Sequence, residues 1–127
     1  MKGAAKGVAI AWLPAPAEKN YVAAQSYLSL MFAEADVQRL VQALRAAPMA
    51  SFAAKDIFRA SGLSLLGVSN AQVDKDRRKI SQGDPLSPIL LVRAPALAKV
   101  IVADGYHRLC AVYSVDEDAL IPAKIVG

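Results

Sequence analysis

The stretch KVIVADGYHRLCAVYSV, residues 99–115, changes its pattern at a glycine. The apolar run before it, residues 99–103, has the length and composition of a buried strand. Beyond Gly105, residues 106–115 have helical spacing, with one apolar face made by Leu109, Val112 and Tyr113. The stretch therefore predicts a strand that turns at a glycine directly into a helix.

Two further apolar runs flank this unit. PILLVR, residues 88–93, follows a Gly-Asp-Pro turn, and IPAKIV, residues 121–126, comes after the helix. Both runs have the length of strands. The order strand, strand, helix, strand after a helical first half predicts an α+β fold with a small mixed sheet.

The first half of the chain is expected to be helical. Apolar periodicity predicts three helices, over residues 21–32, 34–47 and 52–61. Pro48 ends the second of them. A fourth helix is expected from a cap at Asn70 to about Gln82, where Gly83 closes it.

Length and composition indicate one domain, residues 1–127, with 55% hydrophobic residues. No apolar run approaches the roughly 20 residues that cross a bilayer, so no membrane partner is expected. The lone cysteine, Cys110, excludes an intramolecular disulfide and a cysteine-based zinc site. The N-terminus loosely imitates a signal peptide, but its apolar patch, residues 8–13, is short. We interpret it as a strand or a loose leader, with secretion the lesser alternative, and expect a cytoplasmic protein.

The charge balance favours an anionic partner. The net charge is +4 at pH 7 and the pI is about 9.4. The positive charge gathers at the N-terminus and in DKDRRKI, residues 74–80, whereas VDEDAL, residues 115–120, is acidic. Ordinary solvation of a protein surface explains such a balance equally well.

The turn DGYHR, residues 104–108, contains the only histidine of the chain. A glycine between a strand and a helix lets a ligand approach the backbone, and the free N–H groups of a helix start favour anions. His107 and Arg108 add two donors that suit phosphate oxygens. Asp104 repels a phosphate unless Mg²⁺ bridges them or the carboxylate acts as a base. Asp104 and His107 are therefore the candidate catalytic residues.

A plainer interpretation fits the same turn equally well. Asp104 caps the helix, Gly105 serves the turn, His107 lies on the surface and Arg108 pairs with a carboxylate. Caps are found at most helices, whereas ligands are not.

The turn and its flanking strands resemble the ParB/sulfiredoxin superfamily. DGYHR is similar to the G-x-H-R helix start of sulfiredoxin and to the DGHHR version in a serine kinase of the superfamily. GDPLSPILLVR, residues 83–93, is similar to the ParB stretch that leads into an I-x-V-R strand, and IPAKIV to the last strand of sulfiredoxin. The resemblance covers roughly residues 67–127 and leaves the helical part, about residues 18–66, outside it.

The resemblance implies a nucleotide site. In this superfamily the helix start binds nucleotide phosphates, here of ATP, ADP or CTP with Mg²⁺ as an option, and the matching residues are Gly105, His107 and Arg108. The helix before the PILLVR strand also contacts the nucleotide in sulfiredoxin, at the positions of Gln72, Lys75 and Lys79. A solvated polar face explains the two lysines equally well.

Several residues of this sequence differ from the motifs of the superfamily, and the differences argue against some of its activities. Tyr106 stands where sulfiredoxin has its catalytic cysteine, and Cys110 lies one helical turn further on, so reduction of sulfinic acids is not expected. Tyr106 and His107 replace the Glu-Arg of the ParB box, and the few residues that follow leave no room for the DNA-binding helices of ParB. Glu18 and Glu34 are candidates for the catalytic acids of the kinase by residue type only.

Residues 55–69, KDIFRASGLSLLGVS, also resemble the helix-turn-helix of lac-type repressors. Gly62 suits the turn and Ser64 the cap of a recognition helix. That helix would carry leucines at 65 and 66 where a base-reading face is polar. We therefore interpret the segment as a core helix that ends at Gly62, followed by an apolar loop.

The sequence thus predicts a ParB/sulfiredoxin-like domain that binds a nucleotide or another phosphate ligand, with a phosphotransferase or NTPase activity as one option. The alternatives are a DNA-binding or partition-associated module of the ParB-like nuclease type, and a binding module without catalysis. Whether the chain is an enzyme, binds nucleic acid or forms a homodimer stays open at this point.

Overall fold

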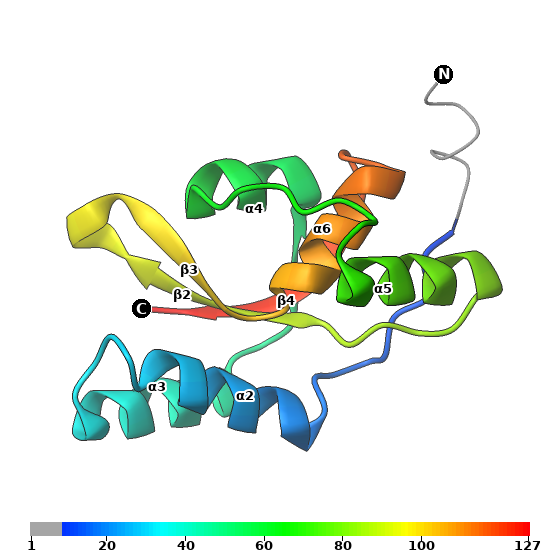
Figure 1. Cartoon of the computed structure of the whole chain (residues 1–127). Coiled ribbons are helices and arrows are strands. Elements are labelled where there is room, and N and C mark those ends of the chain that lie inside the picture. The colour runs from blue at the N-terminus through cyan, green and yellow to red at the C-terminus, as the bar shows by residue number, and fades with distance from the viewer. Residues whose placement is uncertain (1–8) are drawn as a thin grey trace.

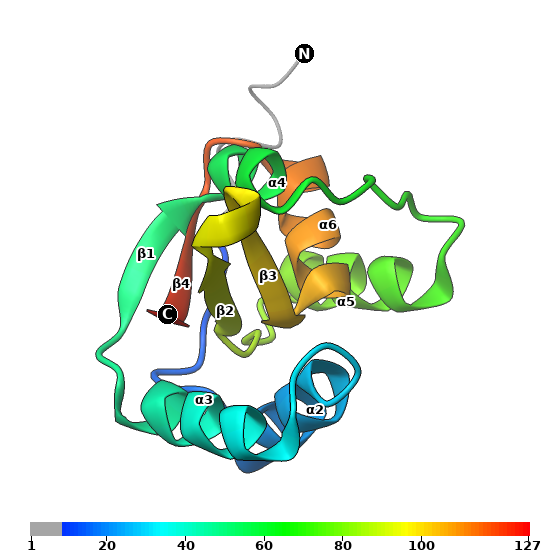
Figure 2. The same cartoon turned by 90° about the vertical axis from the view of Figure 1, so that its left-hand side faces the viewer.

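A computed structural model describes residues 9–127 of the chain. They form three layers, with a sheet between two groups of helices (Figures 1 and 2). The elements, in chain order, are α2 (Glu18–Leu28), α3 (Glu34–Ala46), β1 (Ala50–Ala53), α4 (Ala54–Ser61), α5 (Ala71–Gln82), β2 (Ile89–Ala94), the short 3-10 helix η1 (Pro95–Leu97), β3 (Lys99–Asp104), α6 (Tyr106–Val115) and β4 (Leu120–Val126).

The four strands form one mixed sheet in the order β1-β4-β2-β3. β4 runs parallel to β2, whereas the pairs β1 with β4 and β2 with β3 are antiparallel. The expected α+β fold with a small mixed sheet and a helical first half is therefore confirmed.

The sheet separates two apolar cores because successive side chains of a strand point to opposite faces. In β2, Ile89 and Leu91 belong to the core under α4, α5 and α6, and Leu90 and Val92 belong to the core above α2 and α3. All four side chains are buried. β2 is thus buried on both faces, as its unbroken apolar run indicates.

The helices and strands of the second half match their predicted bounds closely. Asn70 caps α5 by accepting hydrogen bonds from the N–H groups of Gln72 and Val73, at 3.0 and 3.2 Å. Gly83 ends α5 with a φ of 76°. Helix α6 begins at Tyr106 and ends at Val115, as predicted.

The helix predicted over residues 52–61 is wrong at its start. Phe52 lies in β1, opposite Ile121 of β4, and α4 begins only at Ala54. The strand was missed because four residues are too few for a clear pattern, and its pairing with β4 spans most of the chain.

The helix-turn-helix alternative is not formed. Helix α4 ends at Gly62, which has a φ of 68°, and residues 63–67 carry no helix. The interpretation as a helix followed by an apolar loop is confirmed.

The N-terminal apolar patch is described from residue 9 onward, so Val8 and the start of the signal-like segment lie outside the described residues. Trp12 forms an isolated parallel bridge with Leu86, and the N–H of Leu86 donates to the carbonyl of Ala11 at 2.9 Å. Within residues 9–127, none of the helices combines the length and the apolar character needed to cross a membrane.

Candidate functional site

The turn from β3 into α6 requires a glycine. Gly105 has a φ of 117°, and a Cβ atom at this position would lie 2.3 Å from Cγ2 of Ile89. That distance is too short for two carbon atoms, and the backbone conformation is one that L-residues rarely adopt. The turn therefore holds the start of α6 directly against the buried end of β2.

Helix α6 begins without a side-chain cap. Gly105 is the N-cap residue, and the first backbone bond of the helix runs from the N–H of Leu109 to the carbonyl of Gly105, at 2.9 Å. The interpretation of Asp104 as a cap is wrong, because its Oδ2 accepts hydrogen bonds from Asn20 and Arg108 instead. The N–H groups of the first turn thus keep the capacity to bind an anion.

Asp104 and Arg108 form a partly buried ion pair. The distance from Nη2 of Arg108 to Oδ2 of Asp104 is 2.9 Å, and each side chain is 16% exposed. The Nδ2 of Asn20, on α2, donates to the same oxygen at 2.9 Å. The pairing of Arg108 with a carboxylate, part of the plainer interpretation, is confirmed.

Arg108 also fastens the turn to the start of β2. Its Nε donates to the carbonyl of Ser87 at 2.9 Å, and its Nη2 donates to the carbonyl of Pro88 at 3.3 Å. Removing one partner of a buried pair costs about 3–5 kcal/mol, because the other charge is left without a partner. Arg108 therefore has a structural role, besides any contact with a ligand.

Two cavities flank the start of α6. One has a volume of about 310 Å³ and lies on the α5 side, lined by Gln72, Asp76, Asp104, Gly105, Tyr106, His107 and Arg108. The other has a volume of about 270 Å³ and is lined by Ala23, Tyr27, Leu63, Val102, Ala103, Asp104, Gly105, Tyr106 and His107. We call them the α5 cavity and the α2 cavity. They share Asp104, Gly105, Tyr106 and His107, so the DGYHR turn stands between them.

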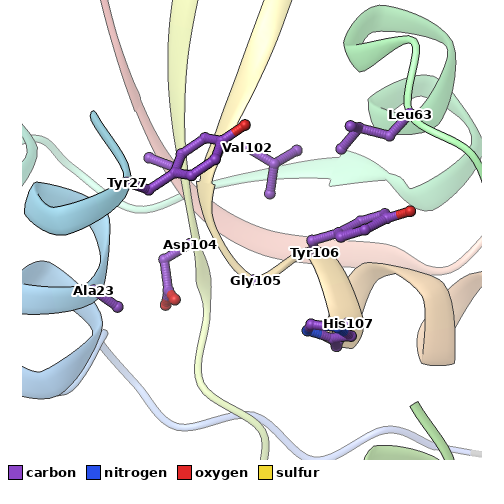
Figure 3. Close-up of a pocket in the computed structure, with 9 residues that line it drawn as sticks. Ala23, Tyr27, Leu63, Val102, Asp104, Gly105, Tyr106 and His107 are labelled. Atoms are coloured by element: carbon purple, nitrogen blue, oxygen red, sulfur yellow. The ribbon is translucent and has the colours of Figure 1, made fainter. Parts of the chain in front are cut away.

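The α2 cavity has an aromatic character. Figure 3 shows Tyr27, from α2, and Tyr106, from α6, on opposite sides of it, with Val102 and Leu63 nearby. The hydroxyl of Tyr106 donates to the carbonyl of Ser64 at 2.5 Å, which ties the loop after α4 to the site. Burial, and to a smaller extent Cys110, raises the pKa of Tyr106 above its ordinary value. Tyr106 is therefore held as a neutral hydrogen-bond donor.

His107 lies at the first turn of α6 and is partly buried. Its ring centroid is 5.5 Å from that of Tyr106, with the planes tilted by 40°. His107 lines both cavities, so it is placed to contact a ligand in either of them.

The candidate residues of α5 are only partly brought to the site. Gln72 lines the α5 cavity, whereas Lys75 and Lys79 line neither of the two cavities. Lys75 is exposed and Lys79 is partly buried. Of the three residues expected on one face of α5, only Gln72 therefore reaches the cavity, through its side-chain amide. The two lysines lie apart from it.

The residues of the site that were missed from the sequence include Asn20, Tyr27 and Asp76. Asn20 and Tyr27 come from α2, far from the DGYHR turn in the chain, and no local pattern indicates them. Asp76 could have been found from the sequence, because it is an acidic residue on the apolar face of α5, between Val73 and Ile80. An acid at such a position is unusual, since carboxylates are rarely buried without a partner.

Cys110 is fully buried and lines neither cavity. Its Sγ accepts a hydrogen bond from the N–H of Leu66 at 3.4 Å. Burial raises the pKa of the thiol, against a smaller opposing effect of that hydrogen bond. A protonated, enclosed thiol is a poor nucleophile.

The other acids do not build a metal centre. Within residues 9–127, no three histidine, cysteine, aspartate or glutamate side chains are grouped so that they could hold a metal ion. Glu18 pairs with Arg45 at 2.6 Å, and the bond with Arg45 lowers the pKa of Glu18. Glu18 and Glu34 line neither cavity. A Mg²⁺ ion here would depend on ligand phosphates for most of its coordination.

Comparison of the chain with protein-family models, with curated proteins and with solved structures gives no match.

Proposed function

We propose that the chain binds a nucleotide or another phosphate ligand in the α5 cavity, with its phosphate at the start of α6. The observation that carries this proposal is the uncapped helix start, which lines a cavity of about 310 Å³ together with His107 and Arg108. Free N–H groups and the positive end of the helix dipole favour an anion at this place. Nucleotide phosphates are anions of suitable size.

The roles of the turn residues follow from their contacts. Gly105 lets the turn pack directly against Ile89 of β2, which fixes the start of α6 at the cavity. His107 donates to a phosphate oxygen. Arg108 holds the turn through its bonds to Asp104 and to the carbonyls of Ser87 and Pro88.

We also propose that the chain is a member of the ParB/sulfiredoxin superfamily. The support is the order of the elements from α5 to β4, in which the three similar sequence blocks form β2, the turn from β3 into α6, and β4, with β2 between β3 and β4 in the sheet. Sulfinic-acid reduction is not part of the proposal, because Tyr106 occupies the position of the catalytic cysteine and Cys110 is enclosed.

A phosphotransferase or NTPase activity is the catalytic version of this function. Two cavities meet at Asp104 and His107, so a phosphate donor in one and an acceptor in the other would contact the same turn. Asp104 accepts bonds from Asn20 and Arg108 at Oδ2, and its Oδ1 is the atom suited to take a proton. Catalysis of phosphoryl transfer rests mainly on such positioning and on charge stabilisation.

Calorimetric titration with ATP, ADP and CTP, with and without Mg²⁺, tests the proposal. We expect binding of at least one nucleotide in the micromolar range. His107→Ala should weaken it about ten- to hundredfold, because a hydrogen bond to a charged group is lost. Arg78→Ala is the matched control, since Arg78 is 73% exposed and pairs with Asp74. Arg108→Ala is unsuitable, because it removes the partly buried ion pair with Asp104 and the bonds that hold the turn.

The binding assay also separates the alternatives. The absence of millimolar or tighter binding for every nucleotide contradicts the proposal. Affinity for duplex DNA that falls steeply with salt, with no nucleotide bound, would instead favour the DNA-binding module. Tight nucleotide binding without turnover would favour a binding module without catalysis.

A further inference from the structure

Asp76 lies in the middle of the buried face of α5. The residue is 3% exposed, and its Oδ1 accepts a hydrogen bond from Nε2 of Gln72 at 3.3 Å. Its Oδ2 is also buried, and no group of the described residues 9–127 donates a hydrogen bond to it. A buried carboxylate oxygen without a donor destabilises a fold, so stability alone does not account for Asp76.

The α5 cavity offers a reason for the residue. Asp76 and Gln72 line it from α5, and the rest of the lining comes from the DGYHR turn. The helix start attracts an anion, whereas a carboxylate accepts N–H or O–H groups and repels an anion. One cavity is therefore lined by two groups that require opposite chemistry from a ligand.

We infer that the ligand of this cavity is a phosphate ester that carries a hydrogen-bond donor, and that Asp76 accepts a hydrogen bond from that donor. The inference rests on the phosphate-binding function proposed above. The phosphate lies at the start of α6. A hydroxyl or amino group of the same molecule reaches α5 and donates a hydrogen bond to Oδ2 of Asp76. Gln72 orients the carboxylate through its bond to Oδ1. Inorganic phosphate or polyphosphate satisfies only the helix start.

The test compares ligands with the same phosphate chain and different donors. Calorimetry of the whole chain with ATP, 2′,3′-dideoxy-ATP and inorganic tripolyphosphate measures how much the donor adds to the binding affinity. We expect ATP to bind at least about tenfold more tightly than tripolyphosphate, as one hydrogen bond to a charged group provides. Dideoxy-ATP that binds like tripolyphosphate identifies a sugar hydroxyl as the donor, and dideoxy-ATP that binds like ATP identifies the base amino group.

Asp76→Leu assigns this difference to the residue. We expect the variant to lose the preference for ATP, while tripolyphosphate binds with unchanged or higher affinity. Its melting temperature without ligand should rise, because the unpartnered carboxylate is gone. Asp76→Asn keeps the shape and should shift binding in the same direction, which covers a Leu variant that fails to fold. Asp74→Asn, close by on α5 and paired with Arg78 on the surface, is the matched control.

The outcomes separate the two proposals. Equal affinity of the natural chain for ATP and tripolyphosphate overturns the role of Asp76 and leaves the phosphate site standing. A lower melting temperature of Asp76→Leu, with both ligands weakened by the same factor, makes Asp76 a structural residue and also overturns it. No binding of either ligand overturns the phosphate site, and the inference with it.

Discussion

Gly105 is the residue on which the site geometry depends. Its φ is 117°, and a Cβ atom added to it would lie only 2.3 Å from Cγ2 of Ile89. A side chain here pushes against a fully buried residue of β2, so the turn has to move away from the sheet. The same movement displaces the start of α6, which lines both cavities.

Gly105→Ala should therefore destabilise the protein by about 3 kcal/mol or more, from the strained backbone and the overpacked core together. Gly83→Ala is the matched control. Gly83 has a φ of 76°, but nothing lies within 4 Å of a Cβ placed there. The Gly83→Ala variant should lose only about 1–2 kcal/mol of stability, from the strained backbone alone. Urea denaturation of both variants measures the difference. Equal losses would show that the contact with Ile89 does not constrain the turn.

At the scale of elements, the sequence predicts best where local chemistry decides. The Asn70 cap and the Gly83 end define α5, and the unbroken apolar run of residues 88–93 defines β2. These signals act over a few residues, so they can be recognised without knowledge of the fold. The strand β1 lacks such a signal, because only its pairing with β4 makes its four residues a strand.

The candidate site shows the same division. His107 and Gly105 were found because they lie in one short turn. The bonds of Arg108 to Ser87 and Pro88, and of Asn20 to Asp104, join segments that are distant in the chain. No pattern within one segment contains them. The separation of the two lysines of α5 from the cavity depends likewise on how α5 packs against α6.

The cap of α5 holds the wall of the α5 cavity in place, because Gln72 is the second residue of that helix. Asn70→Ala should cost about 1 kcal/mol of stability, since the N–H groups of Gln72 and Val73 lose their acceptor. Ser69→Ala, one residue earlier and exposed, is the control and should change stability little. Thermal unfolding measures both. An unchanged midpoint for Asn70→Ala would mean that water replaces the cap.

At the scale of the molecule, the sheet couples two apolar layers. Successive residues of β2 enter opposite cores, so neither layer of helices loses its packing without exposing one face of the same strand. Lys124 of β4, a buried residue, adds a polar link, because its Nζ donates to the carbonyl of Arg45 near the end of α3, at 2.9 Å. The site lies where both layers meet, with Asn20 and Tyr27 from one layer and α5 and α6 from the other.

The two layers should therefore unfold as one unit. Trp12 is the only tryptophan and packs against the core under α4, α5 and α6, so its fluorescence reports that layer. Leu44, on α3, is fully buried in the other core. Leu44→Ala should cost about 2–5 kcal/mol and shift the Trp12 transition and the far-UV circular dichroism transition to the same lower midpoint. If the fluorescence transition stays in place while the dichroism transition shifts, α2 and α3 unfold separately from the layer that contains Trp12.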